Sequence, residues 1–152
     1  QAGMIYRPMF YISAYFEAHR DTYYEKLLAV SRDNDWTGWT RFFLEAVRAQ
    51  AEDNLAKARA ILDLYESMKR KVPEMTRSHY AVHALDWFFQ RPIFQSSDFI
   101  EASGIPAPTA RRFLNVLQGQ GVLKTLSSSR GRRAAVLAFP DLLKIVEGRT
   151  VF

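Results

Sequence analysis

Apolar residues recur at intervals of three or four along most of this chain, the spacing of helices that bury one face. Between residues 9 and 30 the pattern fits one helix or two shorter ones equally well, and the polar run 31–35 interrupts it. From Trp36 the same spacing continues for about thirty residues, and the run 69–76, which contains Pro73, ends it. A helix of this length usually packs along a partner helix, bridges modules or dimerises. Because its apolar stripe would leave an exposed patch, we expect a homodimer through this helical half.

The second half of the chain predicts three shorter helices. Residues 78–90 have an apolar face. The segment from Ser96 to Ser103 begins with a serine N-cap and is followed by Gly104, which can adopt the positive φ of a helix C-terminus. The third helix follows Pro106, which is tolerated only before or within a first turn, and the run 119–121 stops it. Its expected buried face comprises Ala110, Phe113, Leu114 and Leu117.

Two short strand-like runs follow, residues 122–126 and 134–139, separated by the polar and basic turn 127–133. The order helix, helix, turn, helix, hairpin is that of a winged helix-turn-helix. Such a module places its second motif helix in the major groove and its basic hairpin against the DNA backbone or minor groove. We therefore predict a mainly α protein, with a helical segment over residues 1–72 and a winged helix-turn-helix with a small β-hairpin over residues 76–152.

The positive charge of the chain is concentrated in this predicted module. Residues 104–133 contain six Lys and Arg and no Asp or Glu. Residues 1–103 contain 13 basic and 14 acidic residues, and residues 134–152 contain two of each. The net charge of +5 and the pI of about 9.6 therefore report one local patch. Such a patch is typical of a surface that binds phosphates or another polyanion.

The side chains that we predict to contact nucleic acid point away from the buried face of the third helix or belong to the hairpin. An acid-free basic hairpin tip favours contact with phosphates, since an ordinary soluble surface intersperses both signs. The predicted binding residues are Thr109, Arg111, Arg112, Asn115, Lys124, Arg130, Arg132 and Arg133. The alternative is that the module docks a protein or mediates dimerisation, because winged helices serve these purposes too.

Composition limits the remaining possibilities. Without cysteine the chain has no disulfide, thiolate metal site or thiol nucleophile, which is typical of a reducing cytoplasm. No apolar run approaches the roughly 18 residues of a membrane span, so we expect a soluble cytoplasmic protein that contacts no membrane. The chain begins with Gln1 rather than Met, so we expect it to be a piece of a longer protein.

Several blocks of the chain resemble Fic-family proteins immediately downstream of their catalytic motif. The similar positions are 7–17, 19–21, 23–24, 35–36, 39, 42–47 and 50–51, and residues 142–149 resemble the C-terminal end of that family. The resemblance spans nearly the whole chain. It implies that the first half completes an all-helical catalytic core, and that the parent protein transfers AMP from ATP, with Mg²⁺, to a hydroxyl group of a target protein.

The catalytic motif of that family is absent from this chain. The motif, His-Pro-Phe-x-x-Gly-Asn-Gly-Arg with slight variation, supplies the base, the acid that binds the metal and the phosphate cradle. Here His19 is followed by Arg20, and no glycine-rich phosphate loop is present. The resemblance therefore implies a non-catalytic C-terminal region with no catalytic residue or cofactor of its own. Its winged helix is expected to bind DNA for regulation or, as the alternative, to recruit the modification target.

One further group of residues has the spacing of a metal site. His79, His83 and Asp86 share a face of the predicted helix 78–90, an arrangement that can hold zinc. Two imidazoles and one carboxylate without a general-base glutamate beside them are more often surface polar residues. We therefore predict no metal site in this chain.

Overall fold

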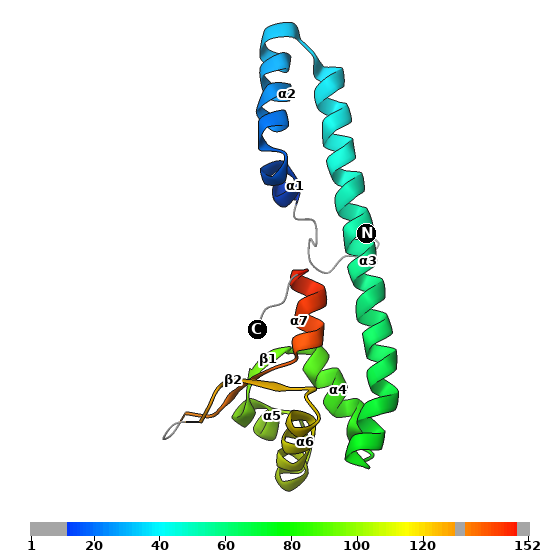
Figure 1. Cartoon of the computed structure of the whole chain (residues 1–152), viewed down its shortest axis with the longest axis vertical. Helices are drawn as coiled ribbons and strands as arrows, with labels where there is room; N and C mark the ends of the chain where they lie inside the picture. Colours follow the sequence, from blue (N-terminus) through cyan, green and yellow to red (C-terminus); the bar gives the residue numbers. More distant parts are fainter. Residues whose placement is uncertain (1–11, 130–132, 149–152) are drawn as a thin grey trace. The chain divides into compact units, whose positions relative to one another are not determined.

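The computed structural model describes residues 12–129 and 133–148, and the fold is mainly helical with one small antiparallel sheet (Figure 1). The elements follow in the order α1 (Ile12–Ala18), α2 (Arg20–Asp33), α3 (Trp36–Thr76), α4 (Ala81–Gln90), β1 (Ile93–Gln95), α5 (Ser96–Ala102), α6 (Ala107–Gly119), β2 (Lys124–Ser127), β3 (Val136–Ala138) and α7 (Pro140–Glu147). Two compact units, Gln1–Ala58 and Arg59–Phe152, divide the chain within α3. Over the described residues, no helix has both the length and the apolar content needed to cross a bilayer.

The first unit, Gln1–Ala58, is held together by aromatic side chains. Two helices, α1 and α2, cover the segment for which the sequence pattern allowed one helix or two. The rings of Phe16 and Phe42 lie 5.8 Å apart between centroids, and those of Tyr23 and Trp39 lie 5.6 Å apart in an edge-to-face arrangement. Such ring pairs add to the stabilisation from burial alone. They pack α1 and α2 against the beginning of α3.

The helix α3 is longer than the sequence pattern predicts. It contains 41 residues, where the spacing predicts about thirty, and it passes through Pro73 to end at Thr76, the last residue of the run 69–76 that was predicted to end it. Its last turn is secured by local bonds: the Thr76 hydroxyl donates to the carbonyl oxygen of Val72 at 2.7 Å, and the Arg77 N–H donates to that of Pro73 at 2.8 Å. Val72 and Thr76 are also buried. Tertiary packing therefore outweighs the hydrogen bond that Pro73 removes.

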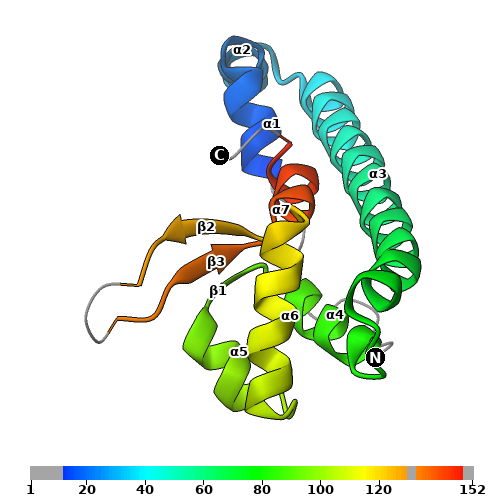
Figure 2. The same ribbon diagram turned by 60° about the horizontal axis from the view of Figure 1, so that its bottom comes forward.

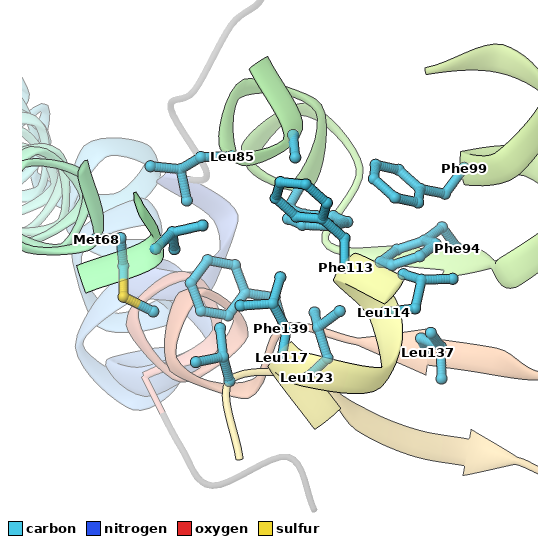
Figure 3. Packing of buried hydrophobic residues seen from close by; sticks show 14 of the residues in the cluster. Met68, Leu85, Phe94, Phe99, Phe113, Leu114, Leu117, Leu123, Leu137 and Phe139 are labelled. Atoms are coloured by element: carbon cyan, nitrogen blue, oxygen red, sulfur yellow. The ribbon is translucent and has the colours of Figure 1, made fainter. Parts of the chain in front are cut away.

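The second unit, Arg59–Phe152, has one hydrophobic core, to which the end of α3, α4, α5, α6 and the sheet contribute. The predicted buried face of α6 is confirmed, because Ala110, Phe113, Leu114 and Leu117 are all buried. The predicted apolar face of α4 is buried as well. In Figure 3, Phe99 of α5 and Phe94 of β1 lie beside Phe113 of α6. This packing fixes α5 and α6 next to each other.

The sheet has three strands in the order β1-β3-β2, whereas the sequence pattern predicts a two-stranded hairpin. The additional strand β1 pairs with β3 from Ile93 opposite Ala138 to Gln95 opposite Val136. Strands β2 and β3 are antiparallel neighbours and form the predicted hairpin, with an irregularity between Thr125 and Ser127. Helix α7, which begins at Pro140, was not predicted from the spacing either.

The turn between α5 and α6 brings the two helices close together. Gly104 has a φ of 72°, as expected for the residue after a helix end, where a side chain would be strained. The prediction that Ser96 is the N-cap of α5 is wrong: Gln95 holds that position, and Ser96 is the first helical residue. The N–H of Ser96 donates to the carbonyl oxygen of Ala135 at 2.8 Å. This hydrogen bond holds the start of α5 next to the residue that precedes strand β3.

A side-chain hydrogen bond connects α3 with α4 inside the second unit. The Tyr65 hydroxyl donates to a carboxylate oxygen of Asp86 at 2.6 Å. This hydrogen bond, assisted by partial burial and the negative charge of Asp86, raises the pKa of Tyr65. Both side chains are half-buried. If the Tyr65 hydroxyl is removed, water can therefore only partly take its place as a hydrogen-bond donor to Asp86.

We expect Tyr65→Phe to lower the free energy of unfolding by about 1 kcal/mol, because it leaves the Asp86 carboxylate without its hydroxyl donor. Urea denaturation followed by circular dichroism measures this change. Tyr24→Phe is the matched control, since the Tyr24 side chain is 56% exposed. Equal effects of the two substitutions would contradict a stabilising role for the Tyr65–Asp86 bond.

Candidate nucleic-acid interface

One exposed face of α6 carries the polar side chains of interest. Arg111, Asn115 and Gln118 are spaced at i, i+4 and i+7, so they lie along the same side of the helix. The buried face of α6 holds this helix against the core of the second unit, and the polar side therefore faces outward. Figure 2 shows α6 beside α5, with β2 and β3 extending from the same unit.

The three side chains line a shallow hollow between α5, α6 and the hairpin. The hollow has a volume of about 330 Å³ and an apolar floor that includes Leu114 and Leu137. Its polar lining comes from Ser96, Arg111, Asn115, Gln118 and Ser129. The Gln118 amide donates to the Thr125 hydroxyl at 2.9 Å, which fixes strand β2 relative to α6. A cationic and amide-bearing helix face therefore lies next to a hairpin.

Where the structure describes them, the cations of this region form no ion pair with an acidic side chain. Within residues 12–129 and 133–148, every ion pair involves residues no later than Lys69, and none includes Arg111, Lys124 or Arg133. All three are exposed. Their charge is therefore available to an external anion, unlike that of a cation already neutralised within the fold.

Arg112 has a partner inside the protein. Its guanidinium Nη1 donates to the carbonyl oxygen of Thr76, the last residue of α3, at 2.8 Å. Because Arg112 follows Arg111 by one residue, its side chain leaves the helix about 100° away around the axis. The structure thus separates the two neighbouring arginines: Arg111 faces the hollow, and Arg112 binds the end of α3.

Thr109 and Lys124 do not join Arg111 on its face. Thr109 precedes Arg111 by two positions, which puts it on nearly the opposite side of α6, and it is half-buried. In strand β2, Thr125 faces α6 through its bond to Gln118, so the adjacent Lys124 points to the other face of the sheet. Two of the predicted binding residues therefore lie away from the hollow.

The hairpin contributes a second group of polar residues. Arg133 lines a hollow of about 750 Å³ together with Gln95, Ser127 and Ser128. The predicted contacts Arg130 and Arg132 lie outside the described residues. Of the eight predicted binding residues, the structure brings Arg111 and Asn115 together on α6 and puts Arg133 on the hairpin.

Three polar lining residues are not among the eight predicted binding residues. The helical spacing did place Gln118 away from the buried face, one turn beyond Asn115, although it was not named as a binding residue. Ser96 and Ser129 had no comparable signal, since only the folded chain brings the start of α5 and the hairpin to α6.

The residues with metal-site spacing have other partners in the structure. The His83 Nε2 lies 2.5 Å from the carbonyl oxygen of Ser103, in the turn before α6. Asp86 accepts the hydrogen bond from Tyr65. In the described part of the chain, no three His, Cys, Asp or Glu side chains form a group that could hold a metal ion.

No model of a known protein family matches this chain. The features that bear on function are therefore the geometry of α5, α6 and the hairpin and the charge distribution of the sequence.

Proposed function

We propose that residues 76–152 form a winged helix-turn-helix that binds duplex DNA. In this proposal α5 and α6 are the two motif helices, α6 enters the major groove, and the β2–β3 hairpin is the wing. The observation that carries the proposal is the exposed face of α6, on which Arg111 and Asn115 lie next to each other without any acidic partner among the described residues. A solvated surface without function would ordinarily mix both charge signs.

The two side chains have the chemistry of direct base readout. A guanidinium can donate two hydrogen bonds to the O6 and N7 atoms of guanine, and a carboxamide can pair with N6 and N7 of adenine. Four residues of helix advance by about 6 Å, which is close to two base-pair steps of B-DNA. Arg111 and Asn115 are therefore proposed to contact purines about two base-pair steps apart, and Arg133 with Arg130 and Arg132 to contact phosphates.

The resemblance to Fic proteins suggests which kind of parent protein this DNA-binding module would belong to. By that resemblance the chain is the non-catalytic C-terminal region of a protein adenylyltransferase, in which ATP and Mg²⁺ belong to the parent protein. Binding of DNA by the second unit would then serve regulation. The competing proposal is that the same surface docks a protein, such as a modification target.

Binding to duplex DNA tests the proposal directly. We expect fluorescence anisotropy to give a dissociation constant of order 10⁻⁴ to 10⁻⁶ M for arbitrary duplexes at physiological salt. Neutralising three to five phosphates should give a slope of log affinity against log salt of roughly −3 to −5. In Arg132→Ala/Arg133→Ala the slope should become shallower by about two, equally on every sequence.

A matched control uses basic residues outside the proposed interface. Arg48→Ala/Lys57→Ala removes the same charge from α3, where both residues form ion pairs with acids on the same helix. This control should leave the salt slope unchanged. If the wild type binds no duplex at low salt, and Arg132→Ala/Arg133→Ala cannot be distinguished from it, the DNA-binding proposal is wrong. The protein-docking proposal then takes its place.

A further inference from the structure

One side of α3 is apolar and exposed over several turns. The side chains of Leu44, Leu55 and Leu62 are 59%, 50% and 63% exposed, and Ala51 and Ala58 between them are exposed too. We refer to these five residues as the α3 stripe. Buried Phe42 and Ala46, which pack in the first unit, lie on the opposite side of the same helix. The α3 stripe is therefore not the face that packs within the first unit.

The spacing of the α3 stripe is that of a coiled coil. Ala51, Leu55, Ala58 and Leu62 follow each other at intervals of four, three and four residues, and Leu44 lies seven residues before Ala51. This repeat of about 3.5 residues keeps a seam of side chains directed at one straight neighbour. Helices that pack in a globular core usually show a wider apolar face. The repeat therefore indicates that the partner of the α3 stripe is a second helix, which runs either parallel or antiparallel to α3.

We propose that the α3 stripe pairs with the α3 stripe of a second copy of this chain in antiparallel orientation, with a two-fold axis between Ala56 and Lys57. In this register two of the three leucines meet an alanine of the other copy: Leu55 meets Ala58, and Leu62 meets Ala51, whereas Leu44 lies opposite Lys69 beyond the apolar seam. Large side chains then fill the space above small ones, which is the packing that allows close helix contact. In a parallel pair in register, leucine would face leucine and alanine would face alanine, so the alanine layers would be left poorly filled.

The charges beside the α3 stripe complement each other in the same register. Exposed Glu52 on one copy comes opposite exposed Arg59 on the other, and the two-fold axis makes this contact twice. Glu52 already binds Arg48 of its own helix at 3.5 Å, so it would lie between two arginines. Farther out, Glu45 comes near Glu66, whose charge is offset by its ion pair with Lys69 at 3.3 Å on the same helix.

Sedimentation equilibrium over about 5–500 µM tests whether the dimer exists. A seam of four leucine–alanine layers is short, so we expect a dissociation constant on the order of 10 µM. Leu62→Glu should weaken dimerisation at least about tenfold, because it puts two unpaired carboxylates into the seam. Leu28→Glu is the matched control: Leu28 lies on α2, is 58% exposed, and should leave the dissociation constant unchanged.

Circular dichroism confirms that both variants keep their helices. A monomer throughout this concentration range would overturn the proposal. A dimer that Leu62→Glu and Leu55→Glu both leave intact would overturn it equally, because dimerisation would then use another surface.

Two further experiments test the antiparallel register. Glu52→Arg should weaken the dimer about tenfold, since it converts two attractive contacts into repulsions, and the exchange Glu52→Arg/Arg59→Glu should restore it. The chain contains no cysteine, so Ala51→Cys and Leu62→Cys can report orientation. Oxidation should link the two single variants only when they are mixed. Disulfides within each variant alone would show a parallel pair and overturn the register.

Discussion

Replacing Phe113 by Ala is expected to lower the free energy of unfolding of the second unit by about 3–5 kcal/mol. The Phe113 side chain is fully buried, at 0% exposure, and belongs to the face that holds α6 on the core. Its removal leaves a cavity between α5, α6 and the sheet, and the loss is a large part of the total stability of an ordinary domain. Thermal and urea denaturation followed by circular dichroism measure the effect.

The same substitution should also affect nucleic-acid binding if the proposed function is right. Arg111 and Asn115 are presented by the face of α6 opposite to its packing, so a loosened helix no longer holds them in one orientation. Val146→Ala on α7 is the control, because Val146 is 46% exposed and its truncation should change stability by no more than about 0.5 kcal/mol. A Phe113→Ala protein as stable as this control would show that the core does not determine the position of α6.

Arg111→Ala and Arg112→Ala are expected to have opposite consequences although the residues are adjacent. Arg111 has no ion-pair partner among the described residues, so its loss should leave stability unchanged. It should weaken binding to a preferred DNA site by about 1–3 kcal/mol, a loss of roughly 5-fold to 150-fold. Arg112→Ala removes the donor to the carbonyl oxygen of Thr76 and should cost about 1–3 kcal/mol of stability.

Denaturation and anisotropy on the same two variants separate these effects. On protein that remains folded, Arg112→Ala should reduce DNA affinity much less than Arg111→Ala does. Lys is the informative second substitution at position 112, since it keeps the charge but does not reproduce the guanidinium geometry. If Arg112→Ala abolished binding without changing stability, the bond to Thr76 would not be the main role of this residue.

The elements of the second unit illustrate how much local sequence determines. The apolar face of α6 and the positive φ of Gly104 follow from spacing and from the properties of glycine, and the structure has both. The hairpin was also predicted, because strand-like runs on both sides of a polar basic turn need no distant information. Strand β1 was not predictable in this way, since three residues become a strand only by pairing with β3.

The length of α3 and the positions of the site residues depend on long-range contacts. Helix propensity alone ends α3 near Pro73, whereas burial of Val72 and Thr76 and the bond from Arg112 extend it to residue 76. The partner of Arg112 is 36 residues away in sequence, so no local pattern could distinguish it from Arg111.

The sequence by itself determined the mainly helical fold, the buried faces of α4 and α6, and the confinement of net positive charge to residues 104–133. These properties depend on the periodicity of side chains along a helix and on composition, which are local quantities. Only the tertiary structure decided that Arg111 and Asn115 face the hollow, that Arg112 binds the end of α3, and that Lys124 lies on the other face of the sheet. The physical reason is that the direction of a polar side chain depends on what its element packs against, and that is fixed by distant residues.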